Sequence, residues 1–539
     1  MALAAILLVG FTLRTIGYAA PGSLWVDELF IALNVTTKSL GELLTSPLAH
    51  RQVAPIGFLA AEKFSTLLFG VNEAALRLFP YLASLVSLAL FWRVASRFLT
   101  DVPRLGAIAI FAMSPAMLWF ARNAKQYSGD VAVTLLILLL AFRFREARPG
   151  SRPSVSVAVI GGLAILFSQP AVIVGATVLA VLVAQQKRSG EGMRPLAAIV
   201  AAWGIGMAVV ASTSLILSPL ETRQFMREGW SGRGFLPLGP EALLWLPHRL
   251  LLILGLFVAQ FVADRWEELA VAGIFGILAL LGWPYLLRKM PARTVLLSSI
   301  VVGAIVAAGA RVLPLSGRVS IYVAPALLIV AMAGMDQIRD WLPSGARGWV
   351  NVGVSGLVAI PVLALTLFVE FPNRREDSKP VLVELRRNLE RGDVIYALPA
   401  SQRALEFYGP ATGIDEWYAA DASRHEVRQQ LADLDSLRGN RRVWFFNSHV
   451  VPCHQLLIRS YLETIGREIM RIEDPRGNKG KSESAAYLYD LSDPVRLGRS
   501  NAQIFPVPDR ISARCGYPEE QPWTKAKDRL RSLVSFLGG

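Results

Sequence analysis

Charged residues are scarce in this chain. Of its 539 residues only 18% are Asp, Glu, Lys or Arg, whereas 53% are hydrophobic. That apolar fraction is high for a soluble protein of this length. The apolar residues come in blocks of about 20, which is the helix length that spans a bilayer core, and these blocks recur along the first two-thirds of the chain. The composition therefore excludes an ordinary soluble protein and predicts an integral membrane protein.

Acidic residues are fewer than basic ones, and the net charge of +14 could indicate nucleic-acid binding. The basic residues, however, lie mainly in short loops between the apolar blocks, a pattern typical of the cytoplasmic face of a membrane protein. We therefore predict the lipid bilayer as a partner and exclude nucleic acid.

Cysteine is almost absent. Cys453 and Cys515 both fall in the C-terminal part, where they either form one disulfide, if that part is extracytoplasmic, or remain two free thiols.

The first apolar segment lacks a basic leader region and a clear cleavage site, so we interpret it as a retained first span rather than a signal peptide. No internal repeat is evident.

The apolar blocks predict a helical bundle of about eleven membrane spans. We place them near 2–20, 76–98, 104–120, 128–144, 154–168, 170–186, 195–217, 267–287, 294–313, 319–340 and 349–370. With this count the arginine-rich turns all fall on one side, which predicts a cytoplasmic N-terminus and an extracytoplasmic C-terminus. The apolar segment 243–262 would invert every later turn if it crossed the membrane, so we predict a helix lying at the outer surface.

The chain changes character after residue 370. Short apolar runs at 394–399, 442–448 and 485–492 are typical of strands, and the segments 421–438 and 454–466 between them are typical of helices. A last helix, 523–537, would pack on the domain or lie on the membrane. We therefore predict two domains: a membrane domain over residues 1–370 and an extracytoplasmic α/β domain over residues 371–539.

The strongest chemical signal is the acidic pair Asp27 and Glu28, in a long loop predicted to follow the first span on the outer face. Adjacent carboxylates at a membrane surface can act as a general base or as metal ligands. An ordinary polar loop beside a helix would look the same.

Arg14 lies within the first span, where a charge needs a partner. We expect that partner to be a carboxylate of the same loop; the alternative is an arginine whose charged end reaches the interface.

Cations also gather at two other predicted outer ends of spans. Arg122, Lys125 and Tyr127 lie close together in sequence and could bind an anionic group such as a phosphate. Arg318 and Tyr322 are one helical turn apart, on one predicted face. Arg and Tyr residues of this kind also serve as simple interfacial anchors.

Two histidines, His50 and His248, lie in predicted outer loops and could bind a divalent metal with the acidic pair. Two unrelated surface histidines are the more common explanation. The cofactor therefore stays unknown, with a divalent metal as one possibility.

Taken together, these residues resemble the GT-C integral membrane glycosyltransferases of the dolichyl-phosphate-mannose–protein mannosyltransferase and aminoarabinose-transferase group. The resemblance covers roughly residues 8–400 and depends on the order of four passages. These are Arg14 with Asp27-Glu28; His50 to Pro55 with Gly70, Glu73, Arg77 and Leu78; Ser114-Pro115 with Phe120-Ala121-Arg122 and Tyr127; and Gly317-Arg318 with Tyr322 and Pro325. The chain departs from the group at Ala54-Pro55, where a double proline is usual, and at Ser168-Gln169-Pro170.

The resemblance implies a sugar donor carried on a polyprenyl phosphate and an envelope acceptor: a lipid, a polysaccharide or a protein. It implies that Asp27 takes the acceptor's proton, and that Glu28 orients substrate, binds a metal or holds Arg14. Arg122, Lys125, Tyr127 and Arg318 would contact the donor phosphate, with Arg14, Arg77 and Tyr322 in support. The alternative function is a membrane transporter or flippase of lipid-linked sugars, which would need ionisable residues at mid-membrane depth. The centres of the predicted spans are nearly free of them.

Overall fold

The computed structural model of the chain describes residues 1–20, 22–147, 154–231, 234–257, 266–343, 377–419, 427–450, 452–474 and 484–507, and single residues between 351 and 364. These residues form two compact units. Unit 1 comprises Met1–Pro21 and Asn34–Pro372, and unit 2 comprises Gly22–Leu33 and Asn373–Gly539. Unit 2 therefore contains the segment of the first loop that carries the acidic pair.

Unit 1 is helical throughout its described residues. Its long helices are α1 (Ala2–Ala19), α6 (Leu78–Ala95), α9 (Tyr127–Glu146), α11 (Pro170–Arg188), α12 (Arg194–Ile216), α15 (Trp266–Lys289), α16 (Pro291–Gly309) and α17 (Ala324–Trp341), the last preceded by the 3₁₀-helix η1 (Gly317–Val323). Shorter helices are α3 (Leu40–Thr45), α4 (Ile56–Phe69), α5 (Glu73–Leu76), α7 (Asp101–Met113), α8 (Pro115–Ala121), α10 (Ser154–Ile165), α13 (Leu220–Trp230) and α14 (Ala242–Gly255). Helix α2 (Val26–Thr37) lies at the boundary of the two units.

Among the described residues, 8 helices are long and apolar enough to cross a membrane, and the bent pair α7–α8 would make 9. The chain therefore has the helices of a multi-pass membrane protein. The expected span 154–168 appears as the shorter helix α10, and the segment 243–262, which we predicted as a surface helix, appears in part as α14. The expected span 349–370 lies almost wholly outside the described residues.

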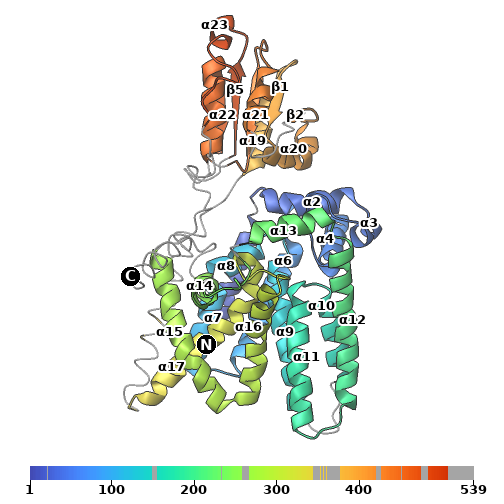
Figure 1. Cartoon of the computed structure of the whole chain (residues 1–539), viewed down its shortest axis with the longest axis vertical. Coiled ribbons are helices and arrows are strands. Elements are labelled where there is room, and N and C mark those ends of the chain that lie inside the picture. The colour runs from blue at the N-terminus through green and yellow to red at the C-terminus, as the bar shows by residue number, and fades with distance from the viewer. Residues whose placement is uncertain are drawn as a thin grey trace. The chain divides into compact units, whose positions relative to one another are not determined.

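Close backbone contact between helices holds unit 1 together. Helices α15 and α17 lie side by side, as α10, α11 and α12 do (Figure 1). At the α15–α17 contact, a Cβ on Gly282 would lie 1.9 Å from the Val330 carbonyl oxygen, and one on Gly334 would lie 2.2 Å from the Leu278 carbonyl oxygen. Small residues allow this approach, which supplies the van der Waals contact that replaces the hydrophobic effect between membrane helices.

The predicted span 104–120 is broken into α7 and α8, which meet at a 47° bend. Pro115 has no backbone N–H, so the carbonyl of Phe111 loses its normal helical donor. Ser114 starts the second helix by accepting a hydrogen bond from the Met117 amide. The bend leaves carbonyl groups at the end of α7 that need donors from elsewhere.

Unit 2 is an α/β domain, as the sequence predicts. Its strands are β1 (Val394–Ala397), β2 (Tyr418–Ala419), β3 (Val443–Asn447), β4 (Arg467–Glu473) and β5 (Ala485–Asp490), in the sheet order β2-β1-β3-β5-β4. Strands β2, β1 and β3 are parallel, whereas β5 is antiparallel to both β3 and β4. The helices are α19 (Ser378–Asn388), α20 (Pro399–Thr412), α21 (Val427–Asp435), α22 (Pro452–Ile465) and α23 (Pro494–Leu497).

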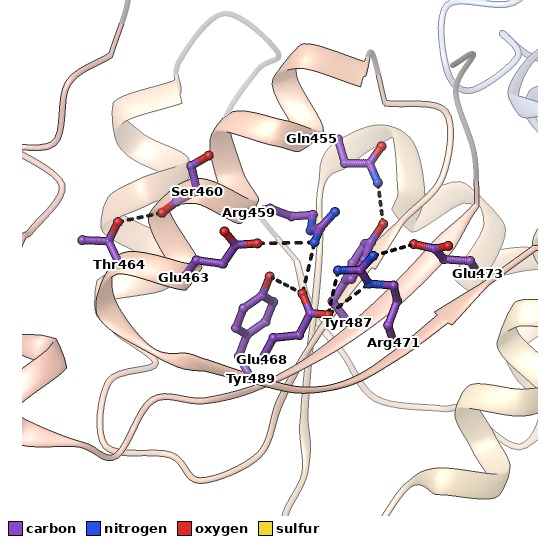
Figure 2. A network of polar contacts seen from close by, with 10 residues as sticks. All are labelled: Gln455, Arg459, Ser460, Glu463, Thr464, Glu468, Arg471, Glu473, Tyr487 and Tyr489. Atoms are coloured by element: carbon purple, nitrogen blue, oxygen red, sulfur yellow. Dashed lines mark hydrogen bonds and ion pairs between the residues drawn. The ribbon is translucent and has the colours of Figure 1, made fainter. Parts of the chain in front are cut away.

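Alternate strand residues fill the core of this domain. The rings of Tyr396, Phe445, Tyr487 and Tyr489 point to the sheet face that α21 and α22 cover. A polar network lies between α22 and strands β4 and β5 (Figure 2). In it Arg459 bonds Glu468 at 3.1 Å, and its guanidinium carbon lies 4.2 Å from the centre of the Tyr487 ring. Cys515, the last predicted helix and the side chain of Cys453 lie outside the described residues.

Candidate functional site

The first part of the site is the turn between α8 and α9, where the sequence predicts an anion-binding cluster. Arg122 ends α8, and its guanidinium carbon lies 5.1 Å from the centre of the Trp119 ring. Lys125 is 6% exposed and donates a hydrogen bond to the side-chain oxygen of Gln52 at 2.7 Å. Tyr127 begins α9 and is nearly buried. The turn is thus joined to the first long loop through Gln52.

Arg318 reaches this turn from a distant part of the chain. It lies on η1, and its guanidinium carbon is 5.9 Å from the centre of the Tyr127 ring, a cation–π distance. Phe120 supports the same ring edge-on at 5.0 Å. The structure therefore brings two of the predicted phosphate-binding residues together from segments far apart in the sequence.

Tyr322 differs from the prediction. We expected Arg318 and Tyr322 to share one face of an α-helix, but the segment is a 3₁₀-helix with about three residues per turn. Residues four apart in such a helix point in different directions, so the predicted shared face is wrong. Tyr322 is 1% exposed and packs inside the bundle, whereas Arg318 is only half-buried.

Arg14 is buried, with 1% of its surface exposed, so it does not extend to the interface. Its Nη1 donates to the carbonyl oxygens of Gly10 at 3.0 Å and of Ala112 at 2.7 Å, and its Nε donates to Ser84 Oγ at 2.8 Å. Nη2 lies 3.5 Å from the Phe111 carbonyl oxygen. Arg14 thus supplies the donors that the bend after α7 leaves missing. Carbonyl oxygens and a serine thus take the place of the carboxylate that we expected beside Arg14.

The acidic pair lies in unit 2, in the first turn of α2. Glu28 is 2% exposed and accepts a hydrogen bond from the Trp25 amide at 3.1 Å. Trp25 is the residue before the helix, so Glu28 performs the side-chain half of a capping box. Asp27, the residue before Glu28, is half-buried. Glu28 therefore holds the start of α2, in the same helical turn as Asp27.

The remaining predicted residues lie on other elements of the chain. Arg77 is 5% exposed and stands between α5 and α6. His50 has a left-handed backbone with φ 61°, and His248 lies on α14. Within the described part of the chain, no group of three or more His, Cys, Asp or Glu residues is arranged to hold a metal ion.

Asp130 is a residue that the sequence analysis missed. It is 3% exposed on α9, hydrogen-bonded to Ser168, and one of its oxygens has no hydrogen-bond partner among the described residues. It is the only acidic residue of the predicted span 128–144. An isolated carboxylate in an apolar span is itself a signal of a functional site, and it could have been found on that ground.

The chain is similar to known proteins in part of its sequence and in its fold. Residues 53–215 match the model of the dolichyl-phosphate-mannose-protein mannosyltransferase family. Among solved structures, ArnT from Cupriavidus metallidurans in the apo state has 14% identity and a TM-score of 0.51, with 93% of this chain and 98% of that chain covered. The oligosaccharyltransferase of Archaeoglobus fulgidus has 12% identity and a TM-score of 0.51, with 91% and 73% covered.

A search of curated protein sequences found no match. At these identities the solved structures show a shared fold and no more. The family match and the shared fold agree with the resemblance predicted from the sequence, and the chain has the fold of these two solved structures.

Proposed function

We propose that this chain transfers one sugar from a polyprenyl-phosphate donor to an envelope acceptor, with inversion, at the outer face of the cell membrane. The observation that carries the proposal is the placement of Arg318 on Tyr127, beside the turn that bears Arg122 and Lys125. This turn lies inside the matched residues 53–215, and the matching family is named for a lipid-phosphate sugar donor.

The cations would act on the leaving group. As the bond between the sugar and the phosphate breaks, negative charge grows on the departing lipid phosphate. Preorganised cations and hydrogen-bond donors stabilise such charge, because they need little rearrangement as it develops. Arg122, Lys125 and Arg318 supply positive charge, and Tyr127 supplies a hydroxyl group together with a ring that positions Arg318.

Asp27 would act on the acceptor. A carboxylate can take the proton from a hydroxyl group as that oxygen attacks the anomeric carbon, and attack opposite the phosphate inverts this carbon. Glu28 would fix the start of α2 through its bond to the Trp25 amide and thereby orient Asp27. The step needs the donor, the acceptor and a proton acceptor, and no redox partner.

The test compares the envelope of a parent strain, a deletion strain, and the deletion complemented with wild-type or Asp27→Asn protein. Mass spectrometry of glycolipids, polysaccharides and glycoproteins identifies the sugar that is lost. We expect one sugar to disappear on deletion, to return with wild type, and to stay absent with Asp27→Asn. Asp101→Asn is the matched control, because this acid is exposed and pairs with Arg104. Restoration by Asp27→Asn would refute the role of Asp27 as the base.

The alternative, a transporter or flippase of lipid-linked sugars, draws its support from Asp130, the buried carboxylate of α9. The same strains separate the two functions. A transferase deletion leaves the acceptor without its sugar while the donor accumulates on the outer leaflet. A flippase deletion leaves the donor on the cytoplasmic leaflet, and Asp130→Asn would then reproduce the deletion.

A further inference from the structure

The segment that carries the acidic pair, Gly22–Leu33, is bound to the C-terminal domain at the start of helix α19. Asp377 is the N-cap residue of α19, yet its carboxylate makes no capping bond to its own helix. It accepts instead the backbone N–H of Ser23 at 3.0 Å and the Ser23 hydroxyl. An N-cap aspartate normally accepts an amide of its own first turn, so a carboxylate directed elsewhere leaves that turn short of an acceptor.

Ser23 supplies the missing acceptor. Its Oγ accepts the Lys379 amide at 2.9 Å, and Lys379 is the second residue of α19. A serine from the first loop thus caps a helix that lies 356 residues further along the chain. Ser23 is 7% exposed and Asp377 is 3% exposed, so both bonds are shielded from water. Lost bonds of buried polar groups are not simply replaced by water.

The next two residues are also held. The Leu24 amide donates to the Tyr408 hydroxyl of α20 at 2.6 Å, and Tyr408 is 2% exposed. The Trp25 ring meets His449 edge-on at 5.8 Å. His449 has a φ of 56°, a left-handed conformation that is uncommon outside glycine and persists where the surrounding structure fixes it.

These contacts lie where α/β domains usually bind a ligand. Strands β1 and β3 are parallel neighbours; after β1 the chain goes to β2 at one edge of the sheet, and after β3 it goes to β4 at the other edge. Ligands bind outside the carboxyl ends of strands at such a switch point. His449 follows β3 directly, and Ser378 of α19 is hydrogen-bonded to Ser448 at the same end. Here the chain's own segment 23–25 makes contacts at this position.

We infer that the C-terminal domain is a clamp that positions Asp27, with Ser23, Asp377 and Tyr408 as its positioning residues. The inference rests on the proposed function, because it assigns Asp27 a reaction to perform. Residues 23, 24 and 25 are each fixed by the domain, and α2 begins at the next residue with Asp27 in its first turn. The path of the helix start, and so the position of the Asp27 carboxylate, is set from the C-terminal domain.

The clamp is tested by Ser23→Ala and Tyr408→Phe in the full-length protein, with Ser23→Thr as the conservative variant. Tyr396→Phe is the matched control, since it removes a buried hydroxyl that bonds the Gln430 carbonyl within the same domain and away from the segment. A misplaced catalytic group can lower the rate by about 100-fold. We expect Ser23→Ala and Tyr408→Phe to lower kcat by about 10- to 100-fold while the donor KM changes by less than about 2-fold. Ser23→Thr should recover most of the loss, and Tyr396→Phe should keep the wild-type kcat.

Hydrogen exchange of the amides of residues 23–25 gives a second readout that needs no turnover. These amides should be protected in wild type and in Tyr396→Phe, and should exchange about 10-fold faster or more in Ser23→Ala. Free exchange in wild type overturns the clamp even if the protein transfers sugar. Protection in a wild type that transfers no sugar overturns the proposed function and leaves the clamp as a structural contact. A wild-type kcat in both Ser23→Ala and Tyr408→Phe overturns the positioning role.

Discussion

The two units hold their polar groups by different means. In unit 1 the buried Arg14 is satisfied by the carbonyl oxygens of Gly10 and Ala112 and by a serine, and α15 and α17 meet backbone to backbone. In unit 2 Arg442 bonds the buried carboxylate of Asp393. Arg459 bonds Glu468 (Figure 2). The buried arginine of the membrane unit thus depends on backbone carbonyls, whereas these two arginines of the C-terminal domain depend on carboxylate side chains.

This difference has a consequence for the proposed reaction. A site that binds a phosphate needs cations held at fixed positions, and helix ends locked by packing provide that. A site that receives different acceptors needs a carboxylate whose position is set by a small number of hydrogen bonds, such as those of Ser23 and Tyr408. Substitutions that add volume should therefore damage unit 1, and substitutions that remove charge should damage unit 2.

The largest effect is expected for Gly334→Leu. A side chain there would enter the backbone of α15, because its Cβ would lie 2.2 Å from the Leu278 carbonyl oxygen. Overpacking against backbone cannot be relieved by a rotamer change and should cost more than about 3 kcal/mol. Yield of monodisperse protein and its thermal midpoint measure the effect. Gly273→Leu is the control on α15, since nothing lies within 4 Å of a Cβ at that position. Equal behaviour of the two variants would show that the α15–α17 contact does not hold unit 1 together.

A smaller effect, on catalysis rather than folding, is expected for Arg318→Ala. The guanidinium that lies over Tyr127 would be lost, and with it the charge that we propose stabilises the departing phosphate. We expect kcat/KM for the lipid-linked donor to fall by about 100-fold, with the thermal midpoint nearly unchanged. Arg318→Lys keeps the charge but not the planar guanidinium, so its kcat/KM should lie between those of wild type and Arg318→Ala. Arg311→Ala is the control, because Arg311 is exposed just before η1. If Arg311→Ala lowered kcat/KM as much as Arg318→Ala does, the loss would result from removing any positive charge in this segment, and not from removing the guanidinium over Tyr127.

Local patterns were enough to predict most of the elements. The three predicted strands appear as β1, β3 and β5, and the ten expected spans within the described residues are helical, although 104–120 is divided between α7 and α8. Strand β4 was missed because Arg467–Glu473 lies at the edge of the sheet and is exposed on both faces, so its sequence shows no clear alternation. The break between α7 and α8 was missed although Pro115 marks it, because the apolar composition continues through the bend.

The contacts of the site could be predicted less well. The acidic pair was found from its position after the first span, but its attachment to α19 joins residues 354 apart in the chain. No periodicity or spacing in the sequence encodes such a pair. Arg14 was correctly identified as unusual, yet its partners are backbone carbonyls, which every residue carries and no pattern distinguishes.

The smallest effect is expected for Asp393→Asn, which tests the charge network of unit 2. Asp393 accepts bonds from Arg442 Nε at 2.6 Å and from Trp444 Nε1 at 2.9 Å. Burial alone would raise the pKa of Asp393, but these bonds and one from the Glu390 amide hold it below its ordinary value. Because the folded-state pKa is the lower one, the carboxylate stabilises the domain above about pH 4. This contribution is lost as the pH falls through the folded-state pKa.

Asp393→Asn should therefore destabilise the domain by about 1 to 3 kcal/mol at neutral pH, and its difference from wild type should shrink as the pH falls below about 4. Hydrogen exchange of the β1 and β3 amides in the full chain, corrected for the intrinsic rate at each pH, measures both the destabilisation at neutral pH and its dependence on pH. Asp493→Asn is the control, because Asp493 is exposed and asparagine is an equally good N-cap for α23. A difference between Asp393→Asn and wild type that stayed constant in acid would mean that the pair is held by shape rather than charge. Unit 2 would then resemble unit 1 in the way it is stabilised.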